Sequence, residues 1–374
     1  MKDLTKGSPS KVMISFAVPV ALGNIFQLCY SLADTRVVGS TLGEAALAAV
    51  GATTSISTLF IGFLSGLTNG FALLIARQFG AGDKRGVTRY GAGCLLLGGI
   101  TALLLTAACV GSLPFILKLL NVPDALMDQS TAYIRAVLLG LLATMLYNGC
   151  ASILRAVGDT TAPLLFLLFA AVLNVALDLL FILKFGFGVA GAAWATVLSQ
   201  SLSALISLVY MFKRYPVFRF SLPDFKLKPC EIKALYASGL SMAAMMSLVF
   251  SGHCLFSVPS IPLDRTLSLL IQRPQDYRIF HAPFSVMGVT MATYCGQNMG
   301  AGKKDRIRTG IRQALILTWI WSLGMIPFKL YSFPMAYMAG DWFEKPRGSL
   351  QCILVLKNRF FILFCPCCHL CFKK

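Results

Sequence analysis

Apolar stretches of membrane-spanning length recur through most of the chain. A helix needs about 20 mostly apolar residues to cross the hydrocarbon core of a bilayer, and the sequence reaches this length repeatedly. The stretches lack the alternation of apolar and polar positions that is typical of barrel strands. The predicted helices occupy residues 12–33, 47–76, 91–117, 132–154, 162–184, 188–212, 234–252, 284–300 and 311–327. The pattern therefore predicts an all-α fold, a polytopic membrane helical bundle.

Composition and the N-terminus support this assignment. Hydrophobic residues make up 57% of the 374 residues and charged residues only 13%, and the mean hydropathy is +0.74, which argues against a water-soluble fold. Lysines precede the first apolar run, as they do in a secretory signal. However, the run continues for about 20 residues without a clear small-residue cleavage site. We expect it to be the first membrane-spanning helix.

The formal net charge of +18 would suit nucleic-acid binding if the basic residues were gathered on one face. Instead, most of the basic residues before residue 253 fall on one side of the predicted membrane. Among the basic residues before residue 253, only four lie at helix ends on the membrane side opposite the N-terminus: Arg36, Lys118, Arg135 and Lys184. The others, including Arg155 after the fourth predicted helix, lie at the N-terminus or in connections on its side. This positive-inside pattern predicts a multi-pass cell-membrane protein with a cytoplasmic N-terminus and no nucleic-acid partner.

A short Gly-rich segment occurs twice. The sequence QFGAGDKR at 78–85 is echoed by NMGAGKKDR at 298–306, 220 residues later. Each copy follows one apolar stretch and precedes another, as expected for a cytoplasmic turn between the second and third helices of a repeated unit. Six helices per unit return the chain to the same side, which predicts two six-helix lobes in parallel repeat. The alternative is a generic Gly-rich turn that recurs by chance.

The repeat suggests how the chain is divided. Pro216, Pro223 and Pro229 break the helical pattern, and six basic residues mark the surrounding segment as cytoplasmic. The expected domains are an N-terminal six-helix lobe at 1–215, a cytoplasmic inter-lobe loop at 216–233, a partial C-terminal lobe at 234–327 and an off-pattern tail at 328–374. The second lobe is therefore expected to be incomplete.

Two carboxylates lie within the apolar segments. Asp34 is near the outer end of the first predicted helix, and Asp178 lies inside the fifth, one turn after Asn174. An ionised carboxylate at a helix centre costs roughly 2.5–3.5 kcal/mol on insertion scales, so such a residue is a functional-site candidate. Residues 174 and 178 share a helix face and can present oxygens to one ion or proton. The alternatives are an interfacial Asp34 that is capped by water and Arg36, and an interhelical hydrogen bond at Asn174 and Asp178.

Several further motifs stand in a fixed order and spacing with these residues. They are Phe16-Ala17-Val18-Pro19, Asp34-Thr35, Val38-Gly39, residues 45–51, Gly80-Ala81-Gly82, Tyr133-Ile134-Arg135, residues 155–160 with Pro163, Asn174 to Asp178, and Gly191-Ala192-Ala193 to Thr196. Together they make the chain similar to the multidrug and toxic compound extrusion (MATE) family. The resemblance is continuous over residues 1 to 252.

The resemblance implies twelve helices in two lobes and the export of drugs or organic cations in exchange for protons or sodium. It implies a monomer with a small-molecule substrate and no cofactor other than the coupling ion, H⁺ or Na⁺. The implied cation-coupling and substrate site comprises Asp34, Tyr133, Asn174, Asp178 and Thr196. No enzymatic activity is expected, because the well-patterned region holds no nucleophile with a base, metal cluster or nucleotide motif.

The family pattern is interrupted in the second half of the chain. Charged residues break the segment 253–283, the pattern resumes to about residue 326, and the tail departs from it again. The resemblance thus implies a transporter that is truncated or frameshifted after about residue 252. The tail segment 365–369 fits a haem-attachment string, CPCCH, but an out-of-frame reading explains it more simply.

Two rival functions follow from the same sequence. A truncated or frameshifted product would be non-functional, because one lobe offers no second wall for alternating access. A flippase for a lipid-linked precursor would share the architecture but should present a strongly cationic central cavity, whereas the intramembrane charges here are acidic. The sequence identifies neither the substrate nor the coupling ion.

Overall fold

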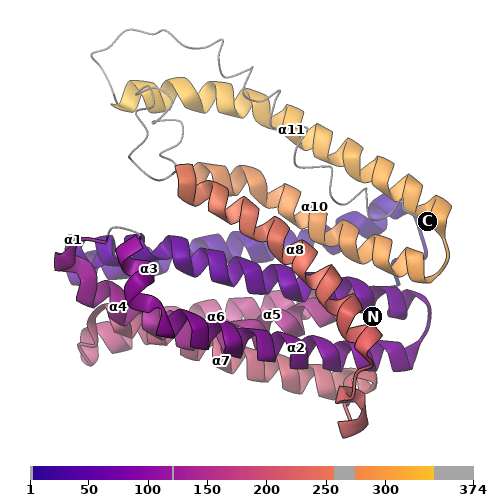
Figure 1. Ribbon diagram of the computed structural model, residues 1–374. Helices are drawn as coiled ribbons and strands as arrows, with labels where there is room; N and C mark the ends of the chain where they lie inside the picture. The colour runs from indigo at the N-terminus through magenta and orange to yellow at the C-terminus, as the bar shows by residue number, and fades with distance from the viewer. Residues whose placement is uncertain (1–2, 120–121, 257–273, 341–374) are drawn as a thin grey trace. The chain divides into compact units, whose positions relative to one another are not determined.

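Every regular element in the described part of the chain is a helix. The structure is a computed structural model that describes residues 3–119, 122–256 and 274–340 (Figure 1). Its α-helices are α1 (Pro9–Gly80), α2 (Lys84–Gly111), α3 (Leu113–Leu119), α4 (Asp124–Leu139), α5 (Leu141–Ala156), α6 (Thr161–Leu179), α7 (Gly188–Arg214), α8 (Pro229–Phe256), α10 (Pro274–Gly300) and α11 (Lys304–Gly340). The predicted all-α bundle is confirmed.

Five helical segments in the described residues are long and apolar enough to cross a membrane. They are Pro9–Gly43, Ile56–Gly80, Lys84–Gly111, Thr161–Lys184 and Gly188–Arg214. The pair α4 and α5 adds a sixth if it is counted as one bent span. This agrees with a multi-pass membrane protein whose first spans begin near the N-terminus.

Helix α1 joins two of these spans, where the sequence predicts separate helices at 12–33 and 47–76. The helical run continues past residue 33 and breaks at Gly43, whose φ of 83° lies in the left-handed region. Only glycine takes this conformation without a steric cost from a Cβ atom. The chain therefore changes direction at one residue instead of through a longer loop.

The fourth predicted helix, 132–154, is bent. Helices α4 and α5 meet at Gly140 and make an angle of 42°. A Cβ atom at Gly140 would overlap the side chain of Val197 on α7. The close approach of α7 thus requires glycine at the bend, and the apolar pattern alone does not reveal it.

The connection between α7 and α8, together with the start of α8, packs against α2 through a hydrogen bond and an ion pair. Thr88 donates a hydrogen bond to the carbonyl of Val217 at 2.7 Å, and Arg89 pairs with Glu231 at 2.7 Å. Asp224 accepts hydrogen bonds from the hydroxyl and the backbone N–H of Ser221, which hold the pKa of Asp224 below its ordinary value. Helix α8 begins at Pro229, within the predicted inter-lobe loop.

The two copies of the Gly-rich segment form the same turn and touch each other. Gly82 and Gly302 have φ values of 74° and 71°. A Cβ atom at Gly80 would overlap the carbonyl oxygen of Gln297, and one at Gly300 would overlap that of Arg77. The C-terminal ends of α1 and α10 therefore approach at backbone distance, which only glycine permits.

The chain divides into two compact units. The unit that holds the candidate site comprises residues 1–258 and 274–319, and the other comprises 259–273 and 320–374. Within the off-pattern segments, 253–256 and 274–283 belong to α8 and α10, and 328–340 belongs to α11. The remaining off-pattern residues, 257–273 and 341–374, lie outside the described residues. The predicted domain boundaries stay predictions.

Candidate cation-coupling site

Four helices bring the five predicted residues toward one place. Asp34 lies on α1, Tyr133 on α4 and Thr196 on α7, and Asn174 and Asp178 lie one turn apart on α6. Asn174 and Asp178 have no exposed surface. Because α6 is otherwise strongly apolar, two fully buried polar side chains on one of its faces require polar partners.

Asn174 links Asp178 to α7. In the amide orientation that satisfies every partner, its nitrogen donates to Asp178 Oδ2 at 2.9 Å and its oxygen accepts from the backbone N–H of Thr196 at 3.1 Å. The interhelical hydrogen bond that the sequence offered as an alternative is therefore present. It does not satisfy the site, however, because Asp178 Oδ1 is buried without a partner among the described residues.

The Asp34 and Asp178 carboxyl groups lie within hydrogen-bonding reach of each other. Two carboxyl groups share a hydrogen bond only when one carries a proton, and two charged carboxylates at this separation need a cation between them. Asp34 Oδ1 is also buried without a partner among the described residues. The pair is thus chemically suited to hold a proton or a small cation.

Arg36 does not neutralise Asp34. Among the described residues no ion pair joins these two side chains, and Arg36 is exposed. The interfacial alternative for Asp34 therefore lacks the ion pair with Arg36 that it would use.

Two tyrosines complete the surroundings. Tyr133 on α4 and Tyr30 on α1 are each close enough to both carboxyl groups to interact with them electrostatically. The Tyr30 hydroxyl donates to Thr196 Oγ1 at 3.3 Å, which ties α1 to α7. Sequence reasoning missed Tyr30. Its position four residues before Asp34, on the same helix face, could have indicated it.

An apolar wall covers one side of the site. Val38, Ala46, Ile182, Val189 and Ala192 form a buried cluster, and Tyr133 packs against it. Such a wall keeps water away from the carboxyl groups and strengthens their interaction with a bound cation. A sodium ion could be held here by the carboxylate oxygens and the Asn174 amide oxygen, and a proton by the carboxyl pair alone.

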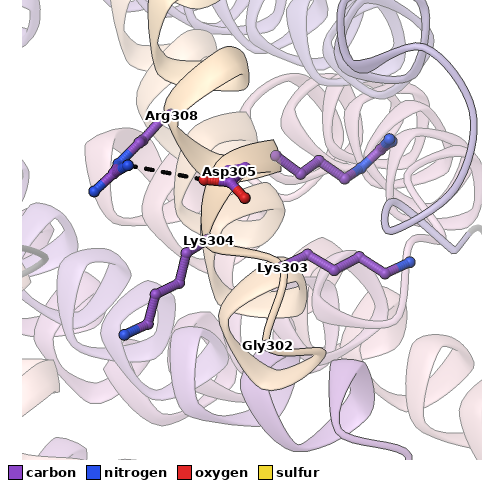
Figure 2. A pocket seen from close by; sticks show the side chains of 6 residues that line it. Gly302, Lys303, Lys304, Asp305 and Arg308 are labelled. Carbon is purple, nitrogen blue, oxygen red and sulfur yellow. Dashed lines mark ion pairs between the residues drawn. The ribbon is translucent and has the colours of Figure 1, made fainter.

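A separate surface hollow lies away from this site. It has a volume of about 610 Å³ and surrounds the start of α11, where Lys303, Lys304 and Arg308 lie. Figure 2 shows Asp305 and Arg308 turned toward each other, at 3.8 Å, while Lys303 and Lys304 extend in opposite directions. This is an open basic edge beside the second Gly-rich turn, and it holds none of the predicted site residues.

The bundle of membrane-spanning helices, with an acidic pair among them, defines a class of protein, the multi-pass membrane proteins. The MatE family model matches residues 19–180. The probable multidrug resistance protein YpnP of Bacillus subtilis is 31% identical over 310 residues, which are 82% of this chain and 68% of that protein. The chain belongs to the MATE family.

Other relatives and solved structures agree. The FAD transporter of Shewanella oneidensis is 25% identical over an alignment of 400 positions. The alignment covers 99% of this chain and 81% of that protein. The outward-facing conformation of a multidrug resistance MATE family transporter has a TM-score of 0.80 at 26% identity, covering 87% of this chain and 73% of that one. A MOP superfamily transporter from Pyrococcus furiosus has a TM-score of 0.81 at 25% identity, and the match covers 92% of this chain and 76% of that one. The resemblance seen in the sequence is confirmed.

Proposed function

We propose that the chain is a secondary active transporter that exports drugs or organic cations from the cell in antiport with protons or sodium. The observation that carries the proposal is the pair of Asp34 and Asp178, each with one buried oxygen that lacks a partner among the described residues. Membership of the MATE family and relatives named as multidrug resistance proteins support it.

The acidic pair provides the coupling. When the pair is ionised, it attracts a cation, and its own repulsion disfavours the close packing of α1 against α6. When a proton or sodium ion binds, the charge is neutralised and close packing becomes favourable. A ligand that binds one conformation better shifts the equilibrium toward it, so ion binding at Asp34 and Asp178 biases the protein between inward-open and outward-open states. The drug binds in the central cleft between the lobes and is released when the bias reverses.

The proposed location is the cell membrane, with the N-terminus in the cytoplasm. The positive-inside distribution of the first 252 residues supports this orientation. In it, both Gly-rich turns lie on the cytoplasmic side, where they touch.

Gradient-driven dye movement tests the proposal. The purified full chain is reconstituted in proteoliposomes with the cationic dye rhodamine 6G, and a pH gradient or a sodium gradient is imposed separately. We expect one of the two gradients to drive the dye against its own concentration gradient. Dye movement equal to that of protein-free liposomes under both gradients would contradict the proposal and favour the non-transporting product.

A further inference from the structure

Arg155 is a half-buried arginine whose contacts the positive-inside pattern does not predict. It occupies the last turn of α5, but its side chain does not extend into the cytoplasmic connection. Its Nη2 atom donates to Ser152 Oγ at 3.0 Å and to Asn69 Oδ1 at 3.4 Å. Its Nε atom is buried and has no partner among the described residues. The guanidinium group thus points into the bundle, and its Nε–H is an unused hydrogen-bond donor among the described residues.

No carboxylate neutralises this group. Among the described residues none of the ion pairs includes Arg155. Asp159 follows Arg155 by four residues but has other partners. It accepts hydrogen bonds from Tyr215 at 2.7 Å, Tyr210 at 3.2 Å and the backbone N–H of Ala162 at 3.1 Å. The partial negative charge at the C-terminal end of α5 offsets about half a unit at most.

A charge that is held partly inside a membrane protein without an ionic partner is costly and indicates a function. The partners of Arg155 are a hydroxyl and an amide, which accept hydrogen bonds but carry no charge. An arginine fork binds carboxylate and phosphate groups with two parallel hydrogen bonds, which makes these oxyanions its natural ligands.

A small cavity lies at this guanidinium group. Its volume is about 10 Å³, and its walls include Asn69, Ser152, Met242 and Thr293. These residues come from α1, α5, α8 and α10, so the two sequence repeats both contribute to it. The volume admits about one water molecule. Residues of α8 and α10 form one part of its wall, and residues of α1 and α5 form the other.

We propose that Arg155 is the subsite for an oxyanion group, a carboxylate or a phosphate, of a substrate in the central cleft. The subsite is closed in this structure and becomes accessible when the two repeats separate. The inference rests on the proposed function only in that the oxyanion belongs to a transported molecule. It assigns the acidic group of such a molecule to a particular residue, Arg155.

A matched pair of dyes tests this subsite by binding, without any need for transport. Rhodamine 19 has a free carboxylate, and rhodamine 6G is its ethyl ester with the same ring system. Fluorescence anisotropy gives the dissociation constant of each dye for the purified full chain. We expect Arg155→Gln to weaken rhodamine 19 by about tenfold or more, as expected for a lost charged hydrogen bond, and rhodamine 6G by less than about twofold. Arg155→Lys, which keeps the charge but not the fork, should fall between.

Controls separate recognition from folding. Arg135→Gln removes an exposed arginine on α4 and should leave both dyes unaffected. Arg155→Gln keeps a side-chain N–H donor for Ser152 and Asn69. The variant should therefore stay monodisperse with a Tm close to that of the wild type. Equal weakening of both dyes, or of neither, would overturn the proposal. If Arg155→Gln does not fold, the proposal is judged on Arg155→Lys alone: weaker binding of rhodamine 19 with unchanged binding of rhodamine 6G supports the subsite, and an equal effect on both dyes or on neither overturns it.

Competition identifies which oxyanion the subsite prefers. Sodium benzoate and inorganic phosphate are each added to the wild type with rhodamine 19 bound. Displacement by benzoate assigns a carboxylate, and displacement by phosphate assigns a phosphate. Displacement by neither contradicts the subsite. Because these readouts are equilibrium binding, they stay informative if gradient-driven transport fails, and transport of rhodamine 6G alone would leave the proposed function standing without the subsite.

Discussion

The acidic site and the arginine cavity differ in which helices build them. Asp34, Tyr133, Asp178 and Thr196 all come from helices of the first repeat, α1, α4, α6 and α7. The cavity at Arg155 is closed by α1 and α5 together with α8 and α10. A movement between the repeats can therefore leave the acidic site intact, whereas it changes the distance between the walls of the cavity. The difference suggests that ion binding is local to one repeat and that substrate access depends on both.

The largest expected effect is at the acidic site. Asp178→Asn keeps the hydrogen bond with Asn174 but removes the charge that we propose to hold a cation. We expect gradient-driven efflux of rhodamine 6G to fall by about a hundredfold, the equivalent of about 3 kcal/mol. Asp128→Asn, which removes an exposed carboxylate on α4, is the matched control and should transport normally. Unchanged efflux by Asp178→Asn would remove this residue from the coupling site.

The contact between the Gly-rich turns can be broken without touching the acidic site. Gly300→Ala places a Cβ atom against the carbonyl oxygen of Arg77, whereas Gly288→Ala on the same helix meets nothing within 4 Å. Overpacking costs about 1–3 kcal/mol, so Gly300→Ala should lower the Tm of the purified chain and Gly288→Ala should not. Rhodamine 6G binding should survive in both. Equal Tm values for the two variants would show that the turns do not pack closely in solution.

The smallest expected effect concerns the amide that orients the acidic pair. Asn174→Ala deprives Asp178 Oδ2 of its donor at 2.9 Å. A hydrogen bond to a charged group contributes about 1.5–3 kcal/mol, so ion dependence of efflux should weaken by about tenfold while some transport remains. Gln129→Ala on the exposed face of α4 serves as the control amide. A full loss equal to that of Asp178→Asn would mean that Asn174 is itself a ligand.

The helices and the acidic pair could be predicted from the sequence because each leaves a local signal. Apolar length indicates a span, and a carboxylate such as Asp178 is conspicuous in an apolar run. The bends at Gly43 and Gly140 could not be predicted, because they depend on a single backbone conformation and on the approach of Val197 from α7.

Arg155 shows a different reason for the limit of sequence reasoning. An arginine at the end of a helix reads as a cytoplasmic charge whether its side chain points into the loop or into the bundle. Only packing decides between the two, since Asn69 is 86 residues away in the sequence. Tyr30 was missed for a similar reason, because its partner Thr196 lies on another helix.

Ion movement driven by substrate tests the central claim most directly. Proteoliposomes that contain the full chain and fluorescent indicators for protons and sodium receive rhodamine 6G on one side, with no ion gradient imposed. Because the proposed coupling through Asp34 and Asp178 would be reciprocal, inward dye movement should drive one of these ions outward. The movement should disappear in Asp178→Asn. Dye uptake above the protein-free rate without countermovement of either ion would contradict antiport.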